Sequence, residues 1–306
     1  MSSSASVTWP PSLWAATAPA GPVLPALEGE VQADVVVIGA GFTGLSTAIH
    51  LREAGVDVVV VEAAEPGWGA SGRNNGQVIP TLAGHDPSAM VARHGAAGER
   101  FNAVLRDSAQ YLFETVRKYD IPAEAEQAGW VQPVHSPGRF KLAEKRVREW
   151  SAIGAPVELL DRAATARTTG SEAWFGGFWN RTGGHINPLA LARGLSQVAL
   201  TLGAVIYARS PVAGMTRQGD RWLVKTAKGA VTARALVLAT IVTGIASMGD
   251  SAALGRIGGR ALGWMSAIVA DEATLDFRTA ATHERMREDM REVARLAASG
   301  AVPEAE

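Results

Sequence analysis

The sequence predicts an α/β fold built on a parallel sheet, and three observations carry this prediction. After Asp34, the run to Ile38 is short and wholly apolar. A glycine turn and a helical pattern over 43–54 follow it, and Gly55 is a natural helix stop. A second apolar run covers 56–61. Such runs are typical of strands buried on both faces of a parallel sheet, and strand, helix and strand in this order form a right-handed βαβ unit.

The other elements follow from periodicity and turn residues. Residues 1–33 are expected to form an irregular arm, and 65–76 a glycine-rich loop. Helical spacing of apolar residues predicts a helix over 98–119, and Asn187-Pro188 predicts the start of another, with Asn as N-cap and Pro in the first turn. Further expected elements are a strand at 130–134, charged helices at 140–150 and 277–299, and strands at 205–207, 212–216, 222–226, 231–232 and 235–239.

The composition excludes several classes of protein. Of the 306 residues, 47% are hydrophobic and 19% are charged, which suits a packed core rather than a disordered chain. The net charge of −1 gives no electrostatic reason to bind nucleic acid or an anionic membrane. The chain has no cysteine, which excludes disulfides, thiolate metal sites and a cysteine nucleophile. Four of its histidines, which are His85, His94, His135 and His185, show no metal-ligand spacing, so no metal is predicted.

No targeting or membrane segment is expected. Residues 1–21 contain no Lys or Arg, and several prolines interrupt them, so they do not match a secretory signal. No stretch reaches the ~18 unbroken apolar residues of a spanning helix. We therefore predict a cytoplasmic protein, and the sequence leaves its oligomeric state open.

The motif Gly39-Ala-Gly41-Phe-Thr-Gly44 carries the chemistry of the βαβ unit. It follows a strand, opens a helix, and has an acidic residue, Glu62, at the end of the next strand. Gly39 allows the tight turn, Gly41 allows close approach of a pyrophosphate, and Gly44 allows close helix–strand packing. Glu62 is suited to accept hydrogen bonds from the ribose hydroxyls of a dinucleotide and disfavours NADP. The unit is thus Rossmann-like, but it does not separate FAD from NAD, and an NAD-dependent dehydrogenase stays open.

The next segment carries a resemblance. The loop Gly67-Trp-Gly-Ala-Ser-Gly-Arg-Asn-Asn-Gly-Gln77 resembles the glycine-rich loop of the D-amino-acid-oxidase-like flavoprotein superfamily, in the form found in its gamma-glutamylputrescine oxidase-like members. Stretches at 12–17, 25–29, 183–189, 203–207 and 235–240 resemble the same group, so the resemblance covers residues 12–240. Asn75 departs from the glycine that is usual at its position, and Asn tolerates a positive φ better than most residues.

The resemblance implies an FAD-dependent oxidoreductase that oxidises the C–N bond of a small-molecule amine or amino acid by hydride transfer to flavin N5. The FAD is expected to be noncovalent, because the loop has no His at the position of covalent attachment and the chain has no Cys. The cofactor-binding residues implied by the motif and the resemblance are Gly39, Gly41, Phe42, Thr43, Gly44, Glu62, Ala63, Ala70, Ser71, Arg73, Asn74, Asn75, Gly76, Gln77, Val212, Ala239 and Thr240.

The implied architecture is α/β, with a Rossmann-like FAD-binding domain and an interleaved, incomplete α+β substrate domain. The FAD-binding domain is expected to comprise 34–80 and 185–240, after the arm at 1–33. The substrate domain is expected to comprise 81–184. Within it, 174–179 is either an aromatic substrate wall or core packing, and Arg181, like Arg73 of the loop, is a candidate to bind a substrate carboxylate. The sequence assigns no catalytic residue.

The resemblance ends at Thr240. The last 66 residues, 241–306, do not follow the superfamily, and 241–264 resembles a short piece of a sodium–dicarboxylate symporter. Two hypotheses therefore stand: an active FAD enzyme whose site is covered in its own way, or a truncated or fused, catalytically inactive dinucleotide-binding remnant. A transporter component is disfavoured because no spanning segment is expected.

Overall fold

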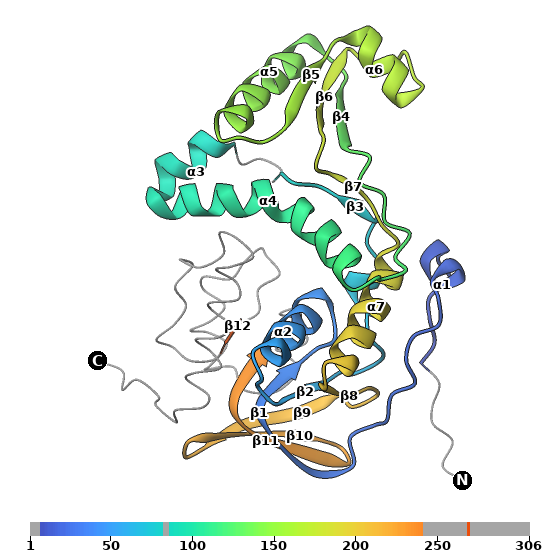
Figure 1. Cartoon of the computed structure of the whole chain (residues 1–306), viewed down its shortest axis with the longest axis vertical. Coiled ribbons are helices and arrows are strands. Elements are labelled where there is room, and N and C mark those ends of the chain that lie inside the picture. The colour runs from blue at the N-terminus through green and yellow to red at the C-terminus, as the bar shows by residue number, and fades with distance from the viewer. Residues whose placement is uncertain (1–6, 82–85, 241–267, 270–306) are drawn as a thin grey trace.

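The computed structural model describes residues 7–81, 86–240 and 268–269 of the chain. Its largest sheet has the strand order β8-β2-β1-β11-β10-β9 (Figure 1). Strands β8, β2, β1 and β11 run parallel, and β10 and β9 continue the sheet antiparallel. The bounds are β1 (Gly29–Ile38), β2 (Val58–Val61), β8 (Val205–Tyr207), β9 (Val212–Gln218), β10 (Arg221–Thr226) and β11 (Gly229–Leu238), and β12 (Ile268–Val269) pairs antiparallel with the end of β11. The predicted α/β fold class is confirmed.

Strand β1 lies at the centre of this sheet, and both of its faces are buried as its apolar run predicts. Val35 and Val37 belong to a core shared with helices α2 (Phe42–Glu53) and α7 (Pro188–Thr201). Val36 belongs to a second core on the other face, with residues of the β9–β11 meander. Residues 35–37 are 0% exposed. The glycine turn at the end of β1 is therefore anchored by packing on both sides.

A second group of elements lies at the opposite end of the molecule (Figure 1). Its antiparallel sheet has the order β4-β6-β5, and a two-stranded pair, β3 and β7, lies between it and the main sheet. The bounds are α3 (Pro87–His94), α4 (Ala96–Lys118), β3 (Gln77–Val78), β4 (Trp130–Val134), α5 (Pro137–Ala152), β5 (Val157–Leu160), α6 (Arg162–Thr169), β6 (Gly176–Asn180) and β7 (Gly184–His185). The C-terminal half of α4 joins the core of the main sheet through Phe113 and Val116.

Several expected helices are confirmed to within three residues at each end, namely α2, α4 and α5. The predicted start of α7 is also confirmed: the Asn187 side chain accepts a hydrogen bond from Ala190 N at 3.1 Å, and Pro188 occupies the first turn. These elements were predictable because their caps and apolar spacing are local in the sequence.

Three expectations need correction, and several elements were missed. The arm is not wholly irregular, because Ser12 caps a short helix, α1 (Leu13–Thr17). Strand β1 begins at Gly29 rather than Asp34, because its first half pairs with β11. The strands expected at 231–232 and 235–239 are one strand, β11. Arg234, which interrupts its apolar pattern, forms an ion pair with Asp34 on β1. The elements that were not expected are strands β3, β5, β6, β7 and β12 and helices α3 and α6.

The predictions for His85, for 241–264 and for the helix at 277–299 lie outside the described residues. In the part of the chain that the structure describes, no helix combines the length and apolar character needed to cross a membrane. The same part contains no group of three or more His, Asp or Glu side chains placed to hold a metal ion.

Candidate active site: a glycine turn and loop at the strand ends

The carboxyl ends of the parallel strands converge on the Gly39–Gly44 turn. Gly39 has a φ of +103°, and its N–H donates to the carbonyl oxygen of Val61 on β2 at 2.9 Å. Ala239 N, at the end of β11, donates to Ile38 O at 2.9 Å. In α/β sheets, ligands bind in the crevice outside such strand ends.

Each glycine of the motif lies where a side chain does not fit. A Cβ at Gly39 would lie 2.7 Å from the carbonyl oxygen of Ala239, and a Cβ at Gly41 would lie 2.8 Å from Ser71 Oγ. A methyl group at Gly44 would overlap the carbonyl oxygen of Gly39. Gly44 thus lets α2 lie against the turn, while Gly39 and Gly41 let the turn lie close to β11 and to the glycine-rich loop.

Glu62 ties the turn to the chain that follows β2. Its carboxylate accepts hydrogen bonds from Ala40 N at 2.7 Å and from Ala64 N at 2.9 Å. Burial raises the pKa of Glu62 above its usual value, although the backbone N–H groups of Ala40, Ala64 and Ala63 act in the opposite direction. Each carboxylate oxygen has more than one acceptor site, so Glu62 can accept further hydrogen bonds from a ligand.

The N-terminus of α2 faces the glycine-rich loop. Gly41 is the N-cap and offers no side chain, and Phe42 N donates instead to Ser71 Oγ at 3.0 Å. Free N–H groups and the positive end of the helix dipole make such a terminus suitable for a phosphate. Thr240 Oγ1, at the end of β11, is buried and has no hydrogen-bond partner among the described residues.

The second half of the loop is braced by its own amide side chains. Asn74 Nδ2 donates to Ser71 O at 2.9 Å, and Asn74 Oδ1 accepts from Gly76 N at 2.9 Å. Asn75 Oδ1 accepts from Gln77 N at 3.1 Å. The positive φ in this stretch belongs to Gly76, at +73°, and not to Asn75. The departure of Asn75 from the glycine of the family pattern therefore introduces no backbone strain.

Four of the remaining cofactor candidates lie in the glycine-rich loop or at the start of β9. Ala70 begins a short 3-10 turn (Ala70–Gly72), and Val212 begins β9. The Arg73 guanidinium lies 4.6 Å from the ring centroid of Trp68, and Gln77 Oε1 accepts from Trp130 Nε1 at 3.0 Å. Arg73 is exposed, so its charge is accessible to a ligand.

One aromatic candidate of the smaller sheet, Phe178, is linked to the loop through Trp130, which packs against Phe178 and donates to Gln77. Arg181 forms an ion pair with Glu158 at 2.8 Å and lies 4.1 Å from the ring centroid of Trp179. Phe178 is 2% exposed and packs edge-on against Trp130, with ring centroids 5.7 Å apart. Phe178 of the aromatic segment 174–179 is therefore better interpreted as a core residue than as part of a substrate wall.

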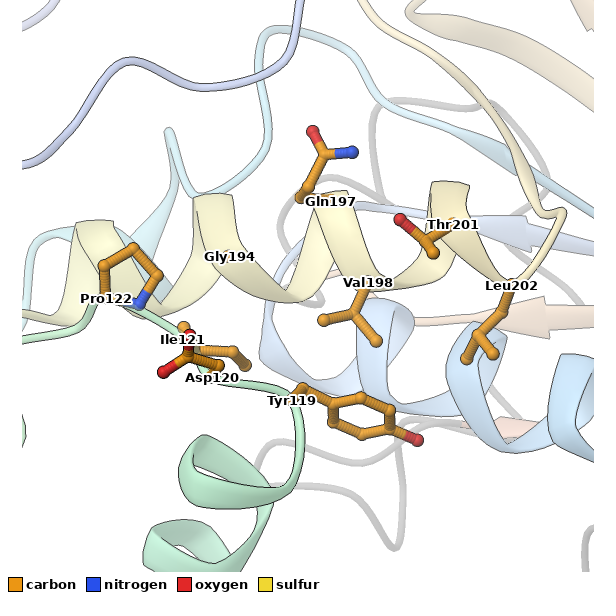
Figure 2. Close-up of a pocket in the computed structure, with 9 residues that line it drawn as sticks. All are labelled: Tyr119, Asp120, Ile121, Pro122, Gly194, Gln197, Val198, Thr201 and Leu202. Carbon is orange, nitrogen blue, oxygen red and sulfur yellow. The ribbon is translucent and has the colours of Figure 1, made fainter.

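Figure 2 shows a groove of about 210 Å³ between α7 and the turn after α4. Tyr119, Ile121, Val198 and Leu202 supply most of its apolar lining, with Gln197 and Thr201 from the polar side of α7. None of the predicted cofactor residues lines this groove. It is a separate hollow from the edge where the glycine turn, Glu62 and the loop meet.

The family model and the curated relatives that match this chain point to the same class of enzyme. Residues 34–274 match the family model described as FAD dependent oxidoreductase (DAO). Gamma-glutamylputrescine oxidoreductase of Escherichia coli is 34% identical over 73% of this chain and 51% of its own length. Probable oxidoreductase OrdL of Haemophilus influenzae is 33% identical over 68% of this chain and 49% of its own.

Solved structures share the fold. Glycine oxidase from Geobacillus kaustophilus superposes with a TM-score of 0.60 at 19% identity, over 74% of this chain and 59% of that chain. The chain spans about half the length of the curated relatives it matches. The match to the family model covers well over half of the residues of this chain. The chain therefore belongs to the DAO family of FAD-dependent oxidoreductases.

Proposed function

We propose that this chain holds FAD noncovalently and belongs to an enzyme that oxidises the C–N bond of a small amine or amino acid. The observation that carries the proposal is the convergence of three features at one sheet edge. These are a turn whose glycines leave no room for a Cβ, the N-terminus of α2, and a carboxylate at the end of β2. The hydroxyl of Thr240, which has no hydrogen-bond partner among the described residues, also fits a polar ligand.

Each part of this edge has a distinct proposed role toward FAD. The N–H groups at Gly41 and the start of α2 would hold the diphosphate, because they combine free donors with the helix dipole. Glu62 would accept hydrogen bonds from the adenosine ribose, and the backbone of Val212 would meet the adenine. The loop from Ala70 to Gln77 would lie along the rest of the cofactor, with Ala239 and Thr240 across from it.

The chemistry that FAD supplies when bound is acceptance of a hydride from the carbon that bears the amine. The proposed role of the residues of this chain is to bind FAD and to hold it in a fixed orientation. Their rigidity supports that role, because the turn is anchored by buried strands and the loop is braced by Asn74 and Asn75. The absence of Cys from the sequence, and of His from 69–77, supports noncovalent attachment.

The substrate class rests on the relatives. One is named for gamma-glutamylputrescine and another for glycine, so amines and amino acids are the compounds to test first. The exposed guanidinium of Arg73 supports a substrate that carries a carboxylate. A cytoplasmic location stays a prediction from the sequence.

The test starts with the visible absorption spectrum of the protein after incubation with FAD and desalting. We expect a retained flavin spectrum that is lost or weakened in Glu62→Gln and kept in Glu158→Gln, a matched change at a partly exposed residue of β5. Anaerobic mixing with gamma-glutamylputrescine, glycine and other amino acids should then bleach the flavin. A folded protein that retains no flavin would contradict the proposal. Retained flavin that no amine reduces would favour the inactive remnant, and affinity for NAD alone would favour a dehydrogenase.

A further inference from the structure

The described part of the N-terminal arm that precedes β1 comprises residues 7–28. It runs beside α7 (Figure 1). The arm is fixed at its C-terminal end beside the loop after β8. Leu27 N donates to Ser210 Oγ at 2.8 Å, and Ala208 N donates to Pro25 O at 2.9 Å. Leu27 is 1% exposed, so this end of the arm belongs to the core.

The other end of the arm touches the glycine-rich loop through Trp14. Its indole Nε1 donates a hydrogen bond to the carbonyl oxygen of Asn74 at 2.8 Å. The edge of the same ring lies 3.2 Å from the position that a Cβ on Gly76 would take. On the inner side, Ile186 N donates to Gly76 O at 2.9 Å. Residues 74–76 are therefore held between the Trp14 ring and the chain that leads into α7.

Trp14 is itself held in place by short-range and long-range contacts. Ser12 Oγ accepts from Ala15 N at 3.1 Å and starts the helix that carries the ring. At the end of that helix, Thr17 Oγ1 accepts from Asn187 Nδ2 at 3.1 Å. Arg193 of α7 donates to Pro19 O at 2.6 Å. The indole is thus presented to the loop by a segment that α7 anchors.

We propose that Trp14 is a positioning residue that holds residues 74–77 of the glycine-rich loop in their FAD-binding conformation. This inference rests on the proposed function. Arg73, Asn74 and Asn75 are exposed, and the hydrogen bond from Trp14 restrains their backbone from outside the loop. A loop that is ordered before the ligand arrives loses less conformational entropy on binding, so the ligand binds more tightly.

The location of Trp14 makes its effect selective. The Gly39–Gly44 turn and Glu62 are expected to hold the ADP portion of FAD, whereas the indole donates its hydrogen bond to Asn74 of the loop. Residues 74–77 are expected to lie along the rest of the cofactor. Loss of the indole hydrogen bond should therefore weaken FAD and leave ADP unaffected, whereas general damage to the fold would weaken both.

The test compares Trp14→Phe with Trp222→Phe, a matched substitution on β10 of the main sheet. Trp14→Phe keeps an aromatic ring but removes the N–H donor and the outer edge of the indole that lies against Gly76. Isothermal titration with FAD and with ADP should show about 2- to 10-fold weaker FAD binding in Trp14→Phe, as expected for one net hydrogen bond, and equal ADP binding. Trp222→Phe should match the parent protein for both ligands. Unchanged FAD affinity in Trp14→Phe, or equal losses for FAD and ADP, would overturn the proposal.

A second measurement needs no flavin. Amide hydrogen exchange over residues 70–77 of the FAD-free protein should be faster in Trp14→Phe than in the parent and in Trp222→Phe. Equal protection in all three proteins would refute the positioning role, whatever the ligand. If the parent protein bound no FAD while this difference in exchange was present, the proposed function would fail and the restraint by Trp14 would stand.

Discussion

The substitution Gly39→Ala tests whether the turn at the end of β1 is as tight as the structure shows. The new methyl group would lie 2.7 Å from the carbonyl oxygen of Ala239, closer than the 3.0 Å below which Cβ contacts are essentially never found. That oxygen cannot easily retreat, because Ala239 N is hydrogen-bonded to Ile38 O at 2.9 Å. The φ of +103° adds a second penalty for any residue with a Cβ.

The steric contact with Ala239 and the penalty of the positive φ can be separated with the substitution Gly55→Ala. Gly55 has a φ of +79°, and a Cβ there would meet nothing within 4 Å, so it carries the backbone penalty alone. That penalty is about 1–2 kcal/mol. Overpacking against fixed backbone adds about 1–3 kcal/mol. We therefore expect the free energy of unfolding to fall by about 1–2 kcal/mol in Gly55→Ala and by about 2–5 kcal/mol in Gly39→Ala.

Urea unfolding followed by tryptophan fluorescence measures both variants against the parent protein. A fall of about 2–5 kcal/mol is a large share of a typical total stability of ~5–15 kcal/mol, so Gly39→Ala should unfold at clearly lower urea. If the two variants unfolded at the same midpoint with the same slope, the contact with Ala239 would carry no energy. The turn would then have room for a side chain at residue 39, contrary to the geometry of the structure.

Three further predictions concern single polar groups. Glu62→Gln should lower the free energy of unfolding by about 1–3 kcal/mol, because the amide leaves one backbone N–H without its acceptor. Burial raises the pKa of Glu62, so the folded state binds its proton more tightly than the unfolded state does. The free energy of unfolding should therefore fall as pH rises above 4.5. Urea titrations across pH should show this fall in the parent protein and not in Glu62→Gln. For Glu53, burial raises the pKa, but hydrogen bonds from Lys118, Tyr119 and His50 outweigh it and lower the pKa to about 2. Its stabilisation should therefore be lost between pH 4.5 and 2, and an unchanged acid limb in Glu53→Gln would contradict this. Asp161→Ala removes the cap on α6, where Asp161 Oδ1 accepts from Ala164 N at 2.7 Å, and should cost about 1 kcal/mol in thermal unfolding without changing FAD affinity.

The βαβ unit could be predicted because its signals are local. A continuous apolar run, three glycines at fixed spacing and one acidic residue lie within thirty positions of each other. The start of α7 was equally clear, because Asn187 and Pro188 adjoin the turn they cap. Cap chemistry and burial on both faces act over a few residues, so a sequence shows them directly.

The corrections come from contacts between distant segments. The first half of β1 is polar enough to look like loop, yet it pairs with the first half of β11, and Arg234 forms an ion pair with Asp34 across the ladder. In the same way, Trp14 and Asn74 are sixty residues apart. No spacing rule links them, so the resemblance predicts that Asn74 lies near the cofactor but predicts no role for Trp14.

The ladder between β1 and β11 has a consequence for how the chain folds. Every pair in it, from Gly29↔Gly229 to Ile38↔Leu238, joins residues 200 positions apart. At synthesis rates of ~5–20 residues per second, β1 waits about 10–40 s on the ribosome for its partner. During that interval one edge of an apolar strand is unpaired, which is the arrangement that favours aggregation. Folding of this protein should therefore be slow and sensitive to chaperones, because its central contact is also its most non-local one.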